Sequence, residues 1–88
     1  MKPVLLFILP GCPHCARALS IMAELQASDP ALAACVPTVI DESSQAELAA
    51  SYDYYYVPTY YVDGKKRHEG AATLEKIRRV FDAALGNE

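Results

Sequence analysis

The feature that most constrains the fold is a run of six apolar residues, VLLFIL at 4–9, followed at once by PGCPHC. A short apolar run between two prolines is typical of a strand that is buried on both faces of a sheet. Pro13 then suits the first turn of a helix, because the N–H that it lacks would be unpaired there anyway. We therefore predict a strand over 4–9 and a helix over about 13–27, with Cys12 and Cys15 at the junction.

The rest of the chain continues to alternate between strand and helix patterns. Ser44 and Glu47 have the spacing of a capping box, which marks the start of a helix. The pair Asp63-Gly64 is a favoured hairpin turn, and Thr73 is a suitable N-cap. The further predicted elements are a turn at 28–31, a strand over 35–40, a helix over about 45–52, a hairpin over 59–69 and a helix over 73–85.

The predicted order is β-α-β-α-β-β-α. Strands that alternate with helices indicate parallel pairing with a right-handed crossover, and the hairpin adds an antiparallel pair. We therefore predict an α/β fold with a mixed four-stranded sheet and helices on both faces. A chain of 88 residues is long enough for one domain and not for two, so we expect a single domain over 1–88.

Charge and hydropathy exclude several classes of partner. The net charge of −3 argues against a protein that binds nucleic acid or an anionic membrane, which would carry a basic excess. The one basic cluster, KKR at 65–67, is interpreted as a guard on an edge strand. No apolar stretch approaches the length of a membrane span, and the first residues lack a signal-peptide cleavage pattern. We expect a soluble, cytoplasmic monomer whose thiols are mostly reduced.

The two cysteines of PGCPHC are placed where a strand gives way to a helix N-terminus. Free N–H groups and the positive end of the helix dipole meet there, and they stabilise a thiolate. We therefore predict that Cys12 is the nucleophile of a thiol–disulfide oxidoreductase and that Cys15, one turn later, resolves the mixed disulfide. Pro13 stiffens the turn between them, and His14 can carry a positive charge beside the sulfur. The dithiol needs no cofactor.

Two other functions use the same residues. A zinc site needs about four ligands, and the remaining candidates, Cys35, His14 and His68, form no second pair at ligand spacing. Redox chemistry is therefore favoured and no metal ligand is assigned, while a metal or iron–sulfur carrier remains an alternative. A non-catalytic adaptor is the third possibility. Cys35 is interpreted as a buried, inert thiol, and His68 as a solvent-facing residue of the hairpin.

Four short segments carry a resemblance that covers nearly the whole chain: FILPGCPHC, VPT at 57–59, VDG at 62–64 and EGA at 69–71. With these the sequence resembles the thioredoxin superfamily, and within it the small glutaredoxin-like proteins. The resemblance implies a thioredoxin fold and a C-P-H-C redox centre. It implies that Pro58 follows a cis peptide bond and faces the cysteines, and that Val57 offers its backbone to a substrate. Tyr55 and Tyr56 would then border the substrate groove.

The departures from that family bear on the electron donor. Glutaredoxins commonly carry a lysine where this chain has Leu9, and they hold glutathione with residues that are replaced here by Ala71 and Thr73. The thioredoxin branch carries a tryptophan before the first cysteine and a buried aspartate at the position of Leu6, and this chain has neither. The expected substrate is a disulfide-containing protein or a small-molecule disulfide. The donor, glutathione or a protein resembling thioredoxin reductase, is left open.

Overall fold

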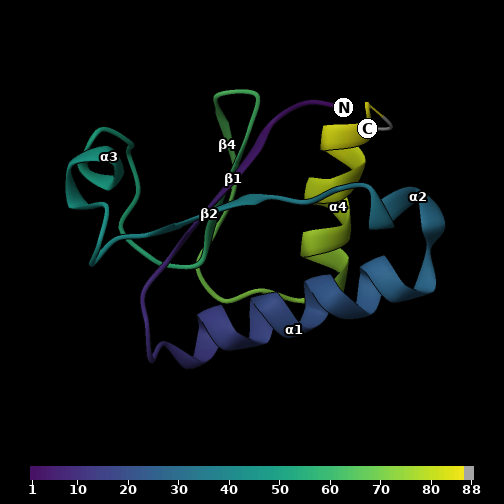
Figure 1. Ribbon diagram of the computed structural model, residues 1–88, viewed down its shortest axis with the longest axis horizontal. Helices are drawn as coiled ribbons and strands as arrows, with labels where there is room; N and C mark the ends of the chain where they lie inside the picture. The colour runs from purple at the N-terminus through teal and green to yellow at the C-terminus, as the bar shows by residue number, and fades with distance from the viewer. Residues whose placement is uncertain (87–88) are drawn as a thin grey trace.

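The computed structural model describes residues 1–86, so the last two residues of the predicted domain lie outside the described part. Eight elements follow one another along the chain. They are β1 (Val4–Ile8), α1 (Pro13–Ser28), α2 (Pro30–Ala33), β2 (Thr38–Asp41), α3 (Ala46–Ala50), β3 (Thr59–Val62), β4 (Lys65–Glu69) and α4 (Leu74–Leu85). The strands form one mixed sheet in the order β2-β1-β3-β4 (Figure 1). The predicted fold class is confirmed.

Strand β1 lies in the interior of the sheet, as its continuous apolar run indicated. It pairs in parallel with β2 and antiparallel with β3. Because successive side chains of a strand point to opposite faces, Val4 and Leu6 enter one core cluster while Phe7 enters another. A strand with two covered faces has no solvent side, which explains why the run lacks polar residues.

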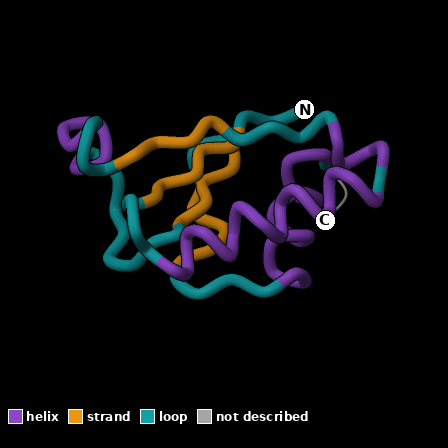
Figure 2. The backbone as a smooth tube through the Cα atoms, turned by 60° about the horizontal axis from the view of Figure 1, so that its bottom comes forward, coloured by secondary structure: helices purple, strands orange, loops and turns teal. Residues whose placement is uncertain are grey.

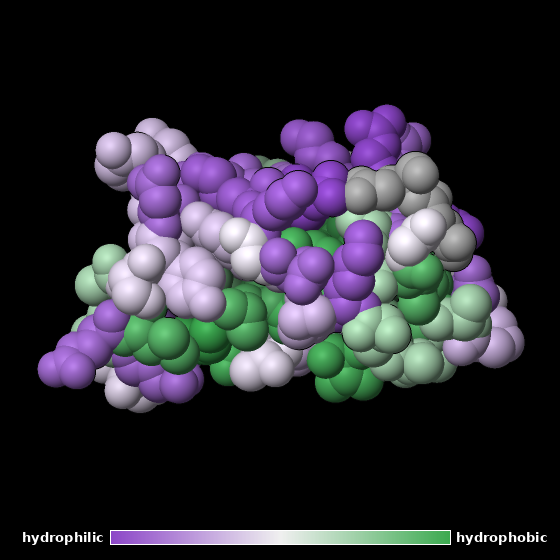
Figure 3. Space-filling model, turned by 90° about the horizontal axis from the view of Figure 1, so that it is seen from above, coloured by the Kyte–Doolittle hydropathy of each residue, from purple (hydrophilic) through white to green (hydrophobic). Residues whose placement is uncertain are grey.

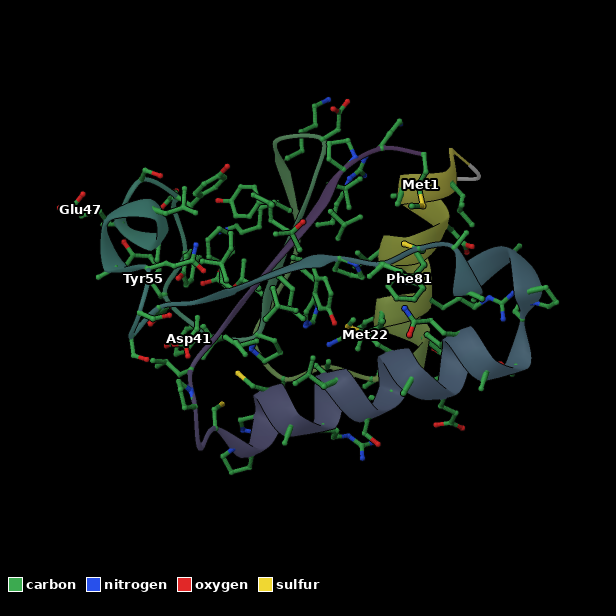
Figure 4. All side chains as sticks on the ribbon, in the orientation of Figure 1. Met1, Met22, Asp41, Glu47, Tyr55 and Phe81 are labelled. Atoms are coloured by element: carbon green, nitrogen blue, oxygen red, sulfur yellow. The ribbon has the colours of Figure 1, made fainter. Side chains whose placement is uncertain are left out.

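The two faces of the sheet are covered unequally. Helices α1 and α4 pack over one face, and Figure 2 shows both on the same side of the strands. Met22 of α1 and Phe81 of α4 lie in the space between these helices (Figure 4). On the other face, Phe7 contacts three tyrosine rings with centroid separations of 4.9 to 5.8 Å. The short helix α3 adds only Ala49 to this second, aromatic cluster.

Three local predictions differ from the structure. The turn predicted at 28–31 contains an additional helix, α2, because the Asp29 carboxylate accepts the N–H of Ala31 and so caps it. Strand β2 begins at Thr38 rather than at 35. The capping box is wrong: the Ser44 hydroxyl donates to the carbonyl of Asp41, and α3 begins after Gln45 with no side-chain cap. Asp41 takes over the turn by accepting the N–H and the hydroxyl of Ser43.

The hairpin of β3 and β4 contains an irregularity that the sequence did not reveal. Tyr60 pairs with His68, but Tyr61 pairs with Lys66, so Arg67 is an extra residue on β4. This arrangement is a β-bulge. The prediction that His68 faces solvent is also wrong. Its ring is half-buried, lies 6.2 Å from the ring of Tyr60 and shares a hydrogen bond with the carbonyl of Gly70.

The surface is mixed in character. Hydrophilic residues cover much of the face seen in Figure 3, with apolar residues exposed in patches between them. Within residues 1–86, no helix combines the length and the apolar character needed to cross a membrane. The strand β4 forms one edge of the sheet, and Lys65, Lys66 and Arg67 are exposed on it, as expected of a guarded edge.

Candidate dithiol site

A tight turn joins β1 to the cysteine pair. The N–H of Cys12 donates to the carbonyl of Leu9 at 3.3 Å, and Gly11 has a φ of 77°. A proline followed by a residue with positive φ is the pattern of a type II turn, in which glycine avoids the steric cost of a side chain. The local sequence LPGC therefore brings Cys12 directly from the end of β1 to the start of α1.

Cys12 is the N-cap residue of α1, and its side chain is half-buried. Its pKa is lowered from the usual value, first by the backbone N–H of Cys15, next by the Cys15 thiol and then, more weakly, by the N–H of His14. N–H groups that point at a sulfur lower its pKa because they favour the negatively charged thiolate over the neutral thiol. The N–H groups involved here belong to the first turn of α1.

Cys15 differs from Cys12 in both burial and acidity. Its side chain is 2% exposed. Burial raises its pKa to about 11, and the Cys12 thiol, the charge of Cys12 and the charge of Glu42 add to that increase. The N-cap thiol and the first-turn thiol therefore have opposite tendencies: the outer one has a lowered pKa, and the inner one keeps its proton.

The two residues between the cysteines lie at the surface. Pro13 is the first residue of α1, where a proline leaves no hydrogen bond unmade. The residue His14 is exposed, and it acts on Cys12 through its backbone N–H. The predicted role of the imidazole as a positive charge beside the sulfur remains a proposal.

Val57 and Pro58 come just before β3, the strand that pairs antiparallel with β1. The peptide bond between them is cis, as the resemblance implied. The β1–β3 ladder ends with Phe7 opposite Thr59. Pro58 and Val57 therefore lie just beyond the end of this ladder, on the side of Ile8 and Leu9. The N-terminal end of β3 thus lies beside the C-terminal end of β1, at the end of the sheet where the chain leads to Cys12.

The parallel strand β2 ends at the same edge. Its last residue is followed by Glu42, whose N–H donates to the carbonyl of Ile8 at 3.0 Å. The carboxylate of Glu42 also raises the pKa of the Tyr54 hydroxyl, as a smaller cause than burial. Sequence reasoning did not single out Glu42. The signal that could have found it is its place directly after a strand that pairs in parallel with β1.

A hollow of about 290 Å³ lies beside the dithiol. Apart from Cys12 and Cys15 it is lined mainly by apolar residues, among them Leu9, Pro10 and Leu19. Leu19 is another residue that sequence reasoning missed, although it lies four positions after Cys15 and therefore on the same face of α1. The hollow offers an apolar surface to whatever approaches the thiolate.

The two tyrosines assigned to the groove are the most exposed aromatic residues of the described chain. Tyr55 is 87% exposed and Tyr56 is 70% exposed. Tyr55 lines a second hollow of about 400 Å³, with Glu42, Tyr52 and Tyr54, against α3. Figure 4 shows it at the same end of the molecule as Glu47 of α3 and Asp41 of β2. Neither Tyr55 nor Tyr56 is among the described residues that line the hollow beside Cys12, so their contact with substrate remains a proposal.

The structure also locates the residues weighed for a metal. Cys35 is fully buried, as predicted, and it precedes β2 rather than beginning it. Its backbone carbonyl accepts a hydrogen bond from the Gln26 side chain at 2.8 Å. Within residues 1–86, no three His, Cys, Asp or Glu side chains come close enough together to hold a metal ion.

The mixed sheet, the cysteine pair at a strand–helix junction and the cis proline at the head of β3 together define a protein of the thioredoxin-fold class. The thioredoxin domain family matches residues 4–82, and the chain belongs to this family. No curated protein matches the chain.

Proposed function

We propose that this protein is a glutaredoxin-like thiol–disulfide oxidoreductase with Cys12 as the nucleophile. The observation that carries the proposal is the opposite pKa shift of two thiols at the start of one helix, the outer N-cap Cys12 and the buried first-turn Cys15. An easily ionised outer thiol can begin an exchange reaction, whereas a protonated inner thiol does not compete with it for the substrate.

The reaction consists of two exchanges. The Cys12 thiolate attacks one sulfur of the substrate disulfide, forms a mixed disulfide and releases the first substrate thiolate. The Cys15 thiol then loses its proton and attacks the Cys12 sulfur, which forms the Cys12–Cys15 disulfide and releases the second substrate thiolate. Two electrons have passed to the substrate. An external thiol donor, either glutathione or a protein resembling thioredoxin reductase, then reduces the Cys12–Cys15 disulfide.

The surroundings of the dithiol favour a substrate with an apolar segment next to its disulfide. Leu9, Pro10 and Leu19 offer an apolar surface beside Cys12. Val57 would pair with an extended stretch of substrate backbone as a short β-strand addition, with Tyr55 and Tyr56 at its side. We propose a disulfide-containing protein or an apolar small disulfide as substrate, a cytoplasmic location and a monomeric state.

Reduction of insulin with dithiothreitol as donor tests the proposal. The wild-type chain should accelerate insulin reduction, and Cys12→Ser should abolish the acceleration. Cys15→Ser should leave the first exchange intact and accumulate a mixed disulfide that mass spectrometry detects. Cys35→Ala is the matched control, because it removes a cysteine outside the pair and should keep the activity. Inactivity of the folded wild-type chain with insulin and with small disulfides, for every donor tried, would refute the proposed function.

The reduction potential of the Cys12–Cys15 pair would establish the direction of electron flow. A value near about −270 mV is typical of a reductant, whereas a value well above about −200 mV is typical of an oxidant or isomerase. Because the imidazole of His14 can stabilise the reduced form, His14→Ala should lower the potential. An unchanged potential would remove the imidazole from the mechanism and leave only the His14 backbone N–H.

A further inference from the structure

The segment of residues 53–58, called here the 53–58 loop, is held by a carboxylate from the neighbouring strand. The Glu69 carboxylate of β4 accepts the backbone N–H of Tyr55 at 2.5 Å and that of Tyr56 at 3.0 Å, both with its Oε2 atom. Its Oε1 atom lies 2.8 Å from the ammonium group of Lys66. One side chain thus fixes two consecutive amides of a loop that presents two highly exposed tyrosines.

Side chains of β3 and β4 also bind the start of the 53–58 loop. The ammonium group of Lys66 donates to the carbonyl of Asp53 at 3.2 Å, and the Tyr61 hydroxyl donates to that carbonyl at 2.7 Å. Lys66 therefore bridges the carboxylate and the loop. Ion pairs at a surface are weak in isolation, but here each charged group also makes hydrogen bonds to the loop backbone.

The bulge at Arg67 makes this arrangement possible. Residues three apart in a regular strand point to opposite faces, so Lys66 and Glu69 would not meet. The extra residue between them changes the alternation by one step and brings both side chains to the same face. The pairing of Lys66 with Glu69 at 2.8 Å is the direct result.

The contacts with Glu69 and Lys66 leave some backbone groups of the 53–58 loop without a hydrogen-bond partner among the described residues. The N–H groups of Tyr55 and Tyr56 go to Glu69, and the carbonyl of Tyr56 accepts the Thr59 hydroxyl. The carbonyl of Pro58 accepts the N–H of Gly70 at 2.9 Å. Within residues 1–86, neither the N–H nor the carbonyl of Val57 has such a partner, and the same holds for both backbone groups of Tyr54 and for the carbonyl of Tyr55. Val57 differs from Tyr54 and Tyr55 by its place, because it lies just beyond the end of the β1–β3 ladder, where β1 leads towards Cys12.

We propose that Glu69 is a positioning residue for substrate: its carboxylate fixes Tyr55 and Tyr56 so that the free backbone groups of Val57 face an incoming polypeptide beside Cys12. This inference rests on the proposed function and deepens it. It separates polypeptide disulfides, whose binding needs Val57, from small reagents, which need only the Cys12 thiolate. Glu69 touches neither the reacting sulfurs nor the substrate, and it acts through the loop.

Amide hydrogen exchange of the wild-type protein tests the contact itself. The Tyr55 and Tyr56 amides should exchange at least about tenfold more slowly than the Val57 amide at pH 5, after correction for intrinsic rates, because a bond to a charged acceptor protects them. Exchange of the two tyrosine amides at the rate of Val57 would overturn the proposal. This measurement needs neither catalysis nor a variant.

Steady-state kinetics of Glu69→Gln test the positioning role. With insulin as the polypeptide disulfide, KM should rise by roughly three- to tenfold. The rate of Cys12 alkylation by iodoacetamide and the Cys12–Cys15 reduction potential should stay at the wild-type values, because the dithiol is not changed. A merely structural role of Glu69 would impair insulin reduction and slow the alkylation of Cys12 together. An unchanged KM, or an equal loss in both assays, would contradict the proposal.

Glu75→Gln is the matched control, because it removes an exposed carboxylate from the first turn of α4. Its KM should equal that of the wild type. If Glu69→Gln does not fold, Lys66→Met provides the second test, since it removes the ion pair with Glu69 and the bridge to Asp53 but keeps the carboxylate that accepts the two tyrosine amides, and it should raise KM by a smaller factor. A wild-type chain that reduces no disulfide but shows the protected amides would refute the proposed function and leave the loop contact established.

Discussion

The backbone N–H of Cys15 stabilises the thiolate of Cys12, while the Cys15 thiol itself is buried and has a pKa of about 11. Cys15 therefore stabilises the Cys12 thiolate with its backbone N–H and, less strongly, with its thiol, while that thiol keeps its own proton. At neutral pH, alkylation by iodoacetamide should modify Cys12 first, and its rate should follow a pKa below the usual cysteine value. Peptide mapping by mass spectrometry over a pH series would check this, and earlier modification of Cys15 would contradict it.

Cys15→Ser gives a second measurement on the same pair. The serine keeps the backbone N–H, which is the largest cause of the low Cys12 pKa, and it replaces the thiol donor by a hydroxyl. The Cys12 pKa should therefore stay below the usual value. Cys35→Ala should not affect it. A return of the Cys12 pKa to the usual value in Cys15→Ser would show that the thiol, not the backbone amide, is the dominant cause.

Gly11→Ala should destabilise the fold by about 1–2 kcal/mol, because its φ of 77° is unfavourable for a residue with a side chain. An added Cβ meets nothing within 4 Å, so the cost is backbone strain alone. Gly64→Ala is the matched control, with a φ of 81° and equally open space in the hairpin turn. Urea unfolding should show similar losses for both variants, whereas only Gly11→Ala should change the alkylation rate of Cys12.

Glu69 should make the stability of the protein depend on acid pH. The Lys66 ammonium and the amides of Tyr55 and Tyr56 lower the pKa of Glu69 to about 2, against a usual value of 4.5. A carboxyl group with a lowered folded-state pKa stabilises the fold above its unfolded-state pKa, and this stabilisation is lost as the pH falls through the folded-state value. The difference in urea midpoint between the wild type and Glu69→Gln should thus be full at pH 5 and shrink towards pH 2.

The same titration with Glu75→Gln provides its control. Glu75 is exposed in the first turn of α4, so its removal should leave a small difference in midpoint with little change between pH 5 and pH 2. A wild-type advantage over Glu69→Gln that stayed constant over this range would show that the carboxylate is not the group responsible.

Phe7 should be the most sensitive position of the aromatic cluster. Its fully buried ring contacts Tyr52, Tyr54 and Tyr61. Phe7→Ala should cost about 3–5 kcal/mol, and the milder Ile40→Val in the same cluster about 0.5–1.5 kcal/mol. Leu74→Ala, at a side chain that is 39% exposed, should change the urea unfolding free energy by less than either. A small effect of Phe7→Ala would indicate that the second face of the sheet contributes little to the core.

The parts of the fold that the sequence predicted are those with a strong local signal. The apolar run at 4–9 has no polar residue, and only an interior strand accommodates such a pattern, so β1 was correctly placed. Asp63-Gly64 likewise marked the hairpin turn between β3 and β4. The cis bond before Pro58 was found by resemblance alone, because composition and spacing contain no signal for it.

The errors arose where several local hydrogen bonds compete. Asp41, Ser43 and Ser44 all carry side chains that can cap a turn, and the sequence does not show which of them wins. The structure gives the turn to Asp41, and the Ser44–Glu47 pattern is left unused. Asp29 and Pro30 are also a suitable N-cap and first helical residue, but the same residue types are common in turns. The sequence therefore predicted a turn where α2 begins.

Other features depended on pairing between distant segments. The sequence marks Glu69 only as part of EGA, because its contact with Tyr55 and Tyr56 depends on the register of β3 against β4. The positions of Glu42 beside Ile8 and of Leu19 in the hollow next to the cysteines likewise depend on how β1, β2 and α1 pack in three dimensions. The residues that flank a position in the sequence do not determine which residue lies opposite it on the next strand.

The bulge at Arg67 has a consequence for how related hairpins can be compared. The number of residues between the Asp63-Gly64 turn and Glu69 decides which side of the hairpin the carboxylate occupies. A deletion of one residue in this stretch would preserve every letter of the EGA segment and still send its glutamate to the opposite side. In comparisons of such chains, a gap at this place therefore signals a changed substrate loop, even where the aligned residues are identical.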